Sequence, residues 1–197
     1  MPARFSIALR LQDALNDTSA SQIAEFAVAL PLLLVMVVGI FDFGNAFNIK
    51  QKVTNTAREA ARFGATQPTN DLSGVPPPNS ILAIRDLVVQ DLQNSKLSDC
   101  GLGSAAANPG GAATPWKWTF TVACGTAGNL VLSVDRGNVF VTNTFISGTQ
   151  VKMIGTNVVL QYPYQWEFSR VIGLLVPGAS YPGTSQISVN SFMANQS

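Results

Sequence analysis

The sequence predicts an α+β fold: a long N-terminal membrane helix continues into an amphipathic stalk, and a small helix and an antiparallel β-sheet follow. Three observations predict it. Residues 26–41 carry no charge, apolar residues keep helical spacing from 46 to 63, and they alternate with polar residues from 116 onward. The 197 residues are therefore expected to divide into an N-terminal segment, a transmembrane and stalk helix that ends at residue 65, and an α+β domain at 66–197.

The uncharged run lies within the apolar segment Ile23–Phe43. Its 16 uncharged residues give about 24 Å of helix, whereas a bilayer core of about 30 Å needs ~20 residues. The span must therefore extend past Glu25 or Asp42. Because the segment is apolar all round rather than striped, a single membrane span is favoured over a buried soluble helix. Pro31 removes one backbone donor inside it and predicts a kink.

Glu25 needs a counterpart if it enters the bilayer. An unpaired carboxylate there costs on the order of 2–3 kcal/mol or more. Three small residues, Ser19, Ala20 and Ser21, lie four to six positions before it. Three motifs follow in order: EFAVALPLLL at 25–34, GIFDFG at 39–44 and NTAREAARFGA at 55–65.

This ordered set resembles the TadE/TadG-like pseudopilins of tight-adherence secretion systems, within the type IV pilin superfamily. The resemblance covers residues 20–65. It implies that residues 1–20 are a leader peptide, which a prepilin-peptidase-like protease removes by cutting between Ala20 and Ser21, so that the transmembrane and stalk helix is 21–65. It also implies that Glu25 neutralises the new amino group, often that of a neighbouring subunit. The alternative is that the leader stays attached and Glu25 simply lies in the subunit interface. The positions expected to serve assembly are Glu25, Phe26, Pro31, Gly39 and Asp42.

The stalk carries a seam of apolar or small residues at alternating intervals of three and four, typical of a helix packed on a partner. Ile49 and Val53 belong to this seam, and we expect them to make helix partner contacts. Arg58 and Arg62 lie four residues apart and form either a solvated face or a site for an anionic headgroup or a partner carboxylate.

The two cysteines, Cys100 and Cys124, are either separate buried thiols or one disulfide. A disulfide is the preferred interpretation, and closing a loop of about 25 residues would stabilise the fold by roughly 3–4 kcal/mol. It would also place the C-terminal domain outside the cytoplasm. The positive-inside rule predicts the opposite orientation, because more Lys and Arg follow the span than precede it.

The C-terminal part contains signals for a second helix and several strands. Ser80 is expected to cap a helix that runs to about Ser95. The turn sequence Asp135–Asn138 predicts a hairpin between strands at 130–134 and 139–142. Further strands are expected at 116–124, 158–164 and 186–192. The short apolar run Val171–Val176 is core, a membrane-facing patch or a subunit contact.

Composition narrows the function classes. A net charge of +1 gives no attraction to nucleic acid. The absence of histidine removes Ser-His-Asp and Cys-His catalysis and histidine metal sites. Five of the acids beyond the stalk are scattered along the chain: Asp86, Asp91, Asp99, Asp135 and Glu167. We therefore expect no enzyme, no cofactor and no metal.

The expected function is that of a pilin-like structural subunit, either a minor pseudopilin or a larger pilin. Its partners would be other pilin-like subunits, the membrane and the processing protease. It would reside in the bacterial inner membrane as a single-pass protein with an extracytoplasmic C-terminal domain, or in a cell-surface filament. The alternative is a membrane-anchored extracytoplasmic module that binds a ligand and does not polymerise.

Overall fold

The computed structural model describes residues 18–72, 77–146, 148–168 and 183–196. The described residues divide into two compact units. The first contains the N-terminal helix up to Gly44 together with Trp166–Phe168. The second consists of two stretches, Asn45–Gln165 and the residues from Thr184 onward. The second unit therefore takes in the stalk residues 45–65, which the sequence analysis assigns to the helix alone.

The long helix, α2, spans Thr18–Thr66, which is 49 residues, and it includes Pro31 without a break. A second helix, α3, spans Asn79–Asn94. Two short 3-10 helices follow, η1 at Leu102–Ser104 and η2 at Gly125–Ala127. The strands are β1 (Ala107–Pro109), β2 (Lys117–Ala123), β3 (Asn129–Ile146), β4 (Thr149–Gln165) and β5 (Thr184–Ala194).

These strands form one antiparallel sheet in the order β1-β2-β3-β4-β5, so each strand pairs with its neighbours in sequence. A long apolar helix, a small helix and an antiparallel sheet are the parts that the sequence predicts. The α+β fold class is confirmed.

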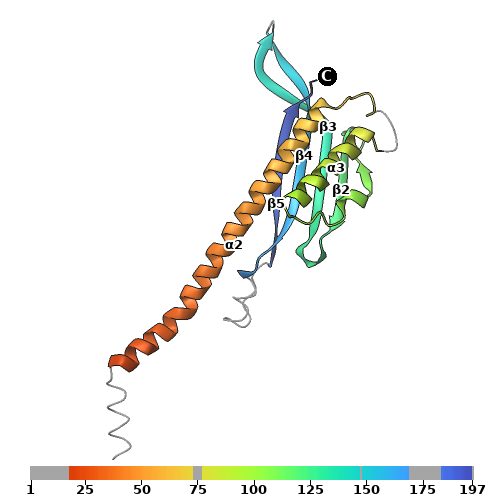
Figure 1. Ribbon diagram of the computed structural model, residues 1–197. Helices are drawn as coiled ribbons and strands as arrows, with labels where there is room; N and C mark the ends of the chain where they lie inside the picture. Colours follow the sequence, from red (N-terminus) through yellow and green to blue (C-terminus); the bar gives the residue numbers. More distant parts are fainter. Residues whose placement is uncertain (1–17, 73–76, 147, 169–182, 197) are drawn as a thin grey trace, which may run out of the picture. The chain divides into compact units, whose positions relative to one another are not determined.

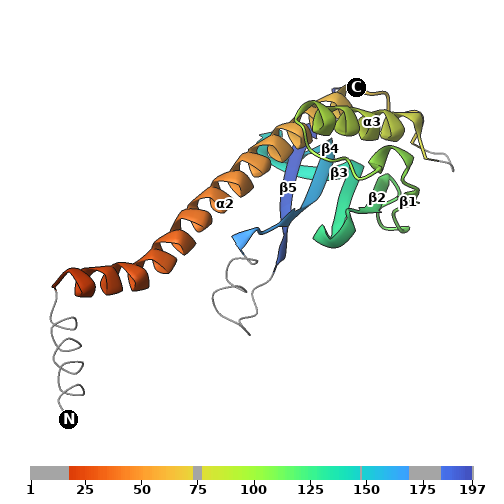
Figure 2. The same cartoon turned by 60° about the horizontal axis from the view of Figure 1, so that its bottom comes forward.

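The core lies on one face of the sheet, beneath the C-terminal half of α2 and α3 (Figures 1 and 2). The strand register places four buried side chains in one row across β2 to β5: Phe120, Leu132, Leu160 and Val189. From the helices come Val53, Ala57, Ala60, Ala61, Ile81, Ile84, Val88 and Leu92. Small residues on α2 allow its backbone to approach the sheet closely.

The next row on the sheet, facing the other way, is mostly polar. It contains Thr119, Ser133, Val159 and Asn190, which are partly or fully exposed. Because successive side chains of a strand point to opposite faces, a sheet covered on one side produces the alternation seen in the sequence. The packing therefore explains why the strands were predictable.

The hairpin predicted at Asp135–Asn138 is wrong. β3 continues through this sequence and pairs with β4 on both sides of a register shift between Asp135 and Asn138. Two β3 residues, Arg136 and Gly137, lie opposite a single β4 residue, so the irregularity is a β-bulge. The turn that joins β3 to β4 lies between Ile146 and Thr149, where Gly148 has φ 79°, a conformation that favours glycine.

The predicted cap on α3 is also wrong. The N-cap residue of α3 is Pro78, and no side-chain hydrogen bond caps the helix there. Ser80 lies inside the first turn, where its backbone N–H donates to the carboxylate of Asp71 at 2.9 Å and its hydroxyl donates at 3.1 Å. An acid from the preceding connection thus satisfies a donor at the helix N-terminus, where negative charge is favourable.

The predicted disulfide is present. Cys100 and Cys124 are joined, with their Cα atoms 5.2 Å apart, and they are 24 positions apart in sequence. The bond ties the segment after α3 to the residue that follows β2. It closes a loop that contains β1 and β2.

Candidate assembly surface on the N-terminal helix

The N-terminal half of α2 exposes its apolar side chains. Ile23, Val28 and Phe41 are 71%, 78% and 75% exposed, and leucines at 30, 32, 33 and 34 are also exposed. An 18-residue window of this helix has a mean hydropathy of 2.5, and none of the window is buried in the chain. Among the described residues this is the one helix long and apolar enough to cross a membrane.

The residues predicted from the resemblance are distributed along this surface. Ala20 and Ser21 lie in the first turn of α2. Glu25 and Phe26 are exposed, whereas Pro31 and Gly39 are partly covered. Glu25 and Phe26 are therefore open to a partner outside the chain.

Asp42 is placed differently, because it is buried. Its side chain is only 6% exposed, although the neighbouring Phe41 and Phe43 are exposed. One carboxylate oxygen accepts a hydrogen bond from the backbone N–H of Phe168 at 2.9 Å. A hydrogen bond to a charged acceptor is among the stronger ones in proteins, so Asp42 fixes the start of the connection that follows β4.

Two further contacts join the same segment to α2. The rings of Phe43 and Trp166 lie 5.1 Å apart between centroids at 59°. A Cβ at Gly39 would be 3.7 Å from the Phe168 ring, so this position is close to the ring. Gly39, Asp42 and Phe43 have the i, i+3, i+4 spacing of one helix face. The predicted apolar run Val171–Val176 lies outside the described residues.

The predicted partner contacts at Ile49 and Val53 need correction. Val53 is 0% exposed inside its own unit, and Ile49 packs against the same core. These two seam residues therefore pack on the core of their own unit. Helical spacing reveals that a partner exists but does not say whether the partner is a different chain or a later part of the same one.

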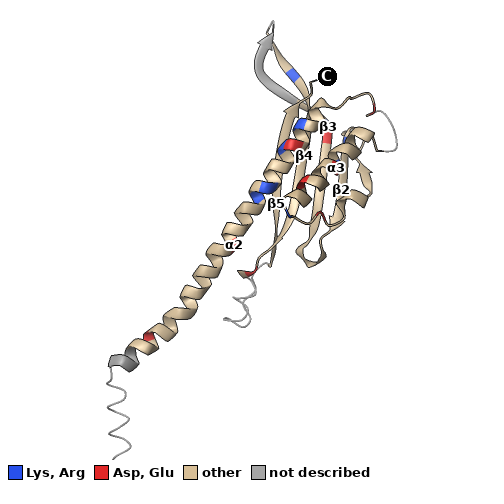
Figure 3. Ribbon diagram, in the orientation of Figure 1, with Lys and Arg blue, Asp and Glu red and all other residues tan. Residues whose placement is uncertain are grey.

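The cations after the apolar segment have different surroundings (Figure 3). Lys52 donates from Nζ to the backbone carbonyl of Ser95 at 2.9 Å, just after the end of α3. Arg62 lies 3.8 Å from Glu59 in an exposed ion pair. Lys50 and Arg58 are exposed on α2.

A buried arginine that the sequence analysis missed holds the C-terminal end of α2. Arg136, in the β3 bulge, is 0% exposed. Its two terminal nitrogens donate to the backbone carbonyls of Gln67 at 2.6 Å and Pro68 at 2.8 Å, just beyond the helix end. Carbonyls at a helix C-terminus lack intrahelical donors and favour positive charge. The bulge thus holds the first two residues after α2.

Asp71 completes this network. It lies 3.9 Å from Arg136 and accepts both hydrogen bonds from Ser80. Burial lowers the pKa of the Arg136 guanidinium, and the nearby Asp71 carboxylate raises it. One arginine and one acid therefore connect the end of α2, the bulge of β3 and the start of α3. No local sequence signal pointed to Arg136, because its neighbours resemble a turn.

Two other groups on this unit have shifted pKa values. Burial raises the pKa of the Tyr162 phenol, opposed by a hydrogen bond with the backbone of Ser98. Burial, followed by repulsion from Glu59, raises the pKa of Asp91. Neither group lies in a cluster with catalytic geometry. Over the described ranges, no three Cys, Asp or Glu side chains gather as a metal site requires.

Comparison with known proteins gives one match. None of the curated proteins and none of the solved structures compared matches the chain. A family model described as TadE-like protein matches residues 20–62. This range contains Glu25, Pro31, Asp42 and the basic stalk residues, so it coincides with the surface described above. The match confirms the TadE-like resemblance over that segment.

Proposed function

We propose that this protein is a pilin-like structural subunit, a minor pseudopilin or a larger pilin. It would be stored in the membrane and would assemble through its N-terminal helix into a pilus or tight-adherence apparatus. The observation that carries the proposal is the apolar window of α2, none of which the chain itself buries. Such a surface needs cover from lipid or from other apolar helices, and a subunit that moves from a membrane into a filament needs both.

Glu25 gives this surface its specificity. It is an exposed carboxylate near the start of an otherwise apolar face. An acid left unpaired among apolar helices strongly disfavours wrong docking, so it selects the arrangement that supplies a positive group. Cleavage between Ala20 and Ser21 by a prepilin-peptidase-like protease would create that group as a free amine.

The orientation we propose places the C-terminal domain on the extracytoplasmic side of the bacterial inner membrane. The disulfide Cys100–Cys124 supports this side, since disulfides persist in oxidising compartments. Two of the cations that argue for the opposite side have partners within the domain, Lys52 at the end of α3 and Arg62 beside Glu59.

Two measurements test the proposal. Mass spectrometry of the native N-terminus is expected to give a chain that begins at Ser21. In membranes, full-length chains with Leu33→Cys, an exposed position on the apolar surface, should cross-link with a bis-maleimide reagent, which leaves the disulfide intact.

The matched variant is Glu25→Gln in the Leu33→Cys background. We expect equal membrane insertion and several-fold fewer cross-linked chains. An intact leader, combined with cross-linking that Glu25→Gln leaves unchanged, would contradict the proposal. It would favour a tethered binding module.

A further inference from the structure

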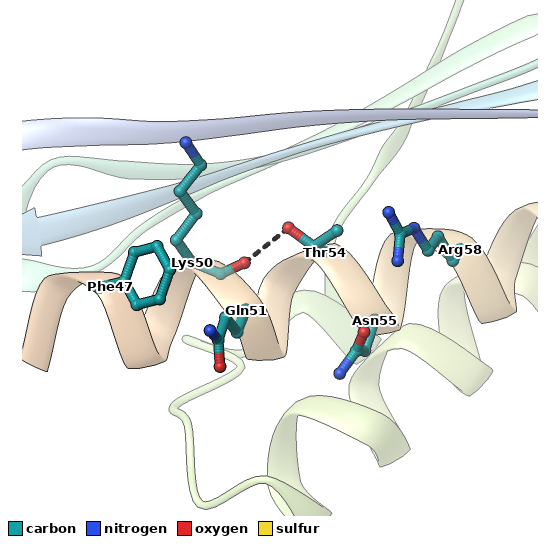
Figure 4. Close-up of a pocket in the computed structure, with 6 residues that line it drawn as sticks. All are labelled: Phe47, Lys50, Gln51, Thr54, Asn55 and Arg58. Atoms are coloured by element: carbon teal, nitrogen blue, oxygen red, sulfur yellow. Dashed lines mark hydrogen bonds between the residues drawn. The ribbon is translucent and has the colours of Figure 1, made fainter.

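A hollow on the exposed face of α2 lies just beyond the apolar surface. It has a volume of about 390 Å³ and is lined by Phe47, Lys50, Gln51, Thr54, Asn55 and Arg58. All six belong to α2, and their spacing over 11 positions keeps them on one side of the helix. Figure 4 shows Lys50 and Arg58 with the amides Gln51 and Asn55 pointing away from Lys50.

The hollow is polar and basic around an exposed phenyl ring. Phe47 is 63% exposed. Thr54 donates its hydroxyl to the carbonyl of Lys50 at 2.7 Å, so it is satisfied by its own helix. Lys50 and Arg58 make no ion pair with any residue that the structure describes. This face therefore carries two positive charges that the chain's described part does not neutralise.

We infer that this face binds the helix of a different pilin-like subunit, one that carries carboxylates about two helical turns apart. The inference rests on the proposed function and names the partner's chemistry. Lys50 and Arg58 are eight positions apart, which is about 12 Å along a helix. Acids seven or eight positions apart on a parallel helix match that separation.

A second copy of this chain fits the face poorly. Two copies packed in the same register and direction bring Lys50 and Arg58 of one chain beside the same cations of the other, and like charges at a contact disfavour it. The stalk residues 45–66 contain one acid, Glu59, which already lies 3.8 Å from Arg62. The face therefore discriminates against self-pairing in register.

An anionic lipid surface also fits less well than a helix. The headgroup layer on each side of a bilayer is about 5–7 Å thick. A helix close to the bilayer normal places Lys50 and Arg58 about 12 Å apart along that normal. Headgroups reach one of the two cations, whereas a partner helix reaches both.

The test uses a charge-reversed copy of the chain as the acidic partner. Full-length Gln51→Cys chains, with the hollow either unchanged or carrying Lys50→Glu and Arg58→Glu, are given different tags and mixed in liposomes. A bis-maleimide reagent then joins neighbouring copies. We expect mixed pairs to exceed like pairs about threefold at low salt, and the preference to fall as salt screens the charges.

A neutral variant keeps the inference falsifiable if the reversed chain folds poorly. Lys50→Gln with Arg58→Gln removes the repulsion and should increase like-pair cross-linking relative to the unchanged hollow. Random pairing in both experiments would overturn the inference. So would an effect of these substitutions confined to binding of vesicles that contain phosphatidylglycerol, because that outcome assigns the face to lipid.

Cross-links at Leu33→Cys distinguish this inference from the proposed function. If they persist while Gln51→Cys pairs show no charge preference, only the partner inference fails. If both sets of cross-links are absent, the assembly role fails as well.

Discussion

The two halves of α2 bury opposite kinds of side chain. From Gln22 to Gly44 the large apolar side chains are exposed, and the one residue in that range that is fully buried is Asp42. From Asn45 to Thr66 the buried set includes Val53, Ala57 and Ala60, whereas the charged residues lie on the outside or at the edge. The first half of α2 thus exposes its apolar side chains, whereas the second half buries a set of them.

This difference shows that the surroundings of each half of α2 decide which types of side chain that half carries. The second half has its cover within the chain, and its small residues fit beneath the sheet and α3. The first half has the composition of a helix covered by lipid or by other helices. Variants that break one half should therefore leave the other half intact, and each prediction below uses that separation.

The largest effect is expected from Arg136→Met. The substitution leaves the carbonyls of Gln67 and Pro68 without their donors and Asp71 without its buried cation. Breaking a buried charged network of this kind costs about 3–5 kcal/mol of unfolding free energy. Denaturant unfolding of the detergent-solubilised chain, followed by circular dichroism, measures it.

Arg62→Met is the matched control, because Arg62 makes only an exposed ion pair with Glu59. A change of about 0.5 kcal/mol or less is expected there. Equal losses from the two variants would show that Arg136 does not anchor the second half of α2.

Asp42→Ala should weaken the attachment of Phe168 to the first half of α2. It removes the acceptor for the Phe168 N–H and lowers the local opening free energy by about 1.5–3 kcal/mol. Faster hydrogen exchange at the Phe168 amide and altered Trp166 fluorescence are the expected readouts. Asp42→Asn keeps an acceptor oxygen and should change both less. A shift in the unfolding midpoint of the second unit would argue against the separation of the two halves.

Gly64→Ala tests how closely α2 approaches the sheet. A Cβ there would lie 2.7 Å from Thr156 Cγ2 and 2.9 Å from Ile84 Cδ1, which predicts a loss of about 1–2 kcal/mol once the better helix propensity of alanine is included. Gly44→Ala is the control in the same helix, since a Cβ there meets nothing within 4 Å. Its unfolding midpoint should not fall. Identical behaviour of the two glycines would contradict the close packing of the second half.

The smallest effect is expected from Asp91→Asn. Because burial raises the folded-state pKa of Asp91 above its ordinary value of 3.8, its stabilising contribution is complete below that pH and is lost as the pH rises through the folded pKa. The variant should therefore be more stable than the native chain at pH 7, and the gain should vanish below pH 3.8. Thermal unfolding at both pH values checks this. Asp86→Asn, at an exposed position, should show no such gain.

Much of this architecture could be predicted from local patterns. The apolar run and the stalk spacing gave the long helix, and alternation gave β2, residues 158–164 of β4, and β5. The assembly residues came from a resemblance over the first third of the chain. The predictions were correct where the structure depends on residues that are close together in the sequence.

The errors arose where distant residues decide the structure. Asp135–Asn138 has turn chemistry, yet Arg136 is needed by carbonyls almost 70 positions earlier, and the chain forms a bulge there. Ser80 has capping chemistry, yet Asp71 takes that role from the preceding connection. The seam at Ile49 and Val53 was correct as a seam, but its partner was the chain's own sheet.

The contact between Arg136 and the chain just after α2 also has a mechanical consequence. The guanidinium bonds the carbonyls of Gln67 and Pro68, so it ties the end of α2 to the bulge of β3. A force along the second half of α2 would therefore reach the sheet through this contact. In the proposed assembly, the buried arginine would have to withstand that force.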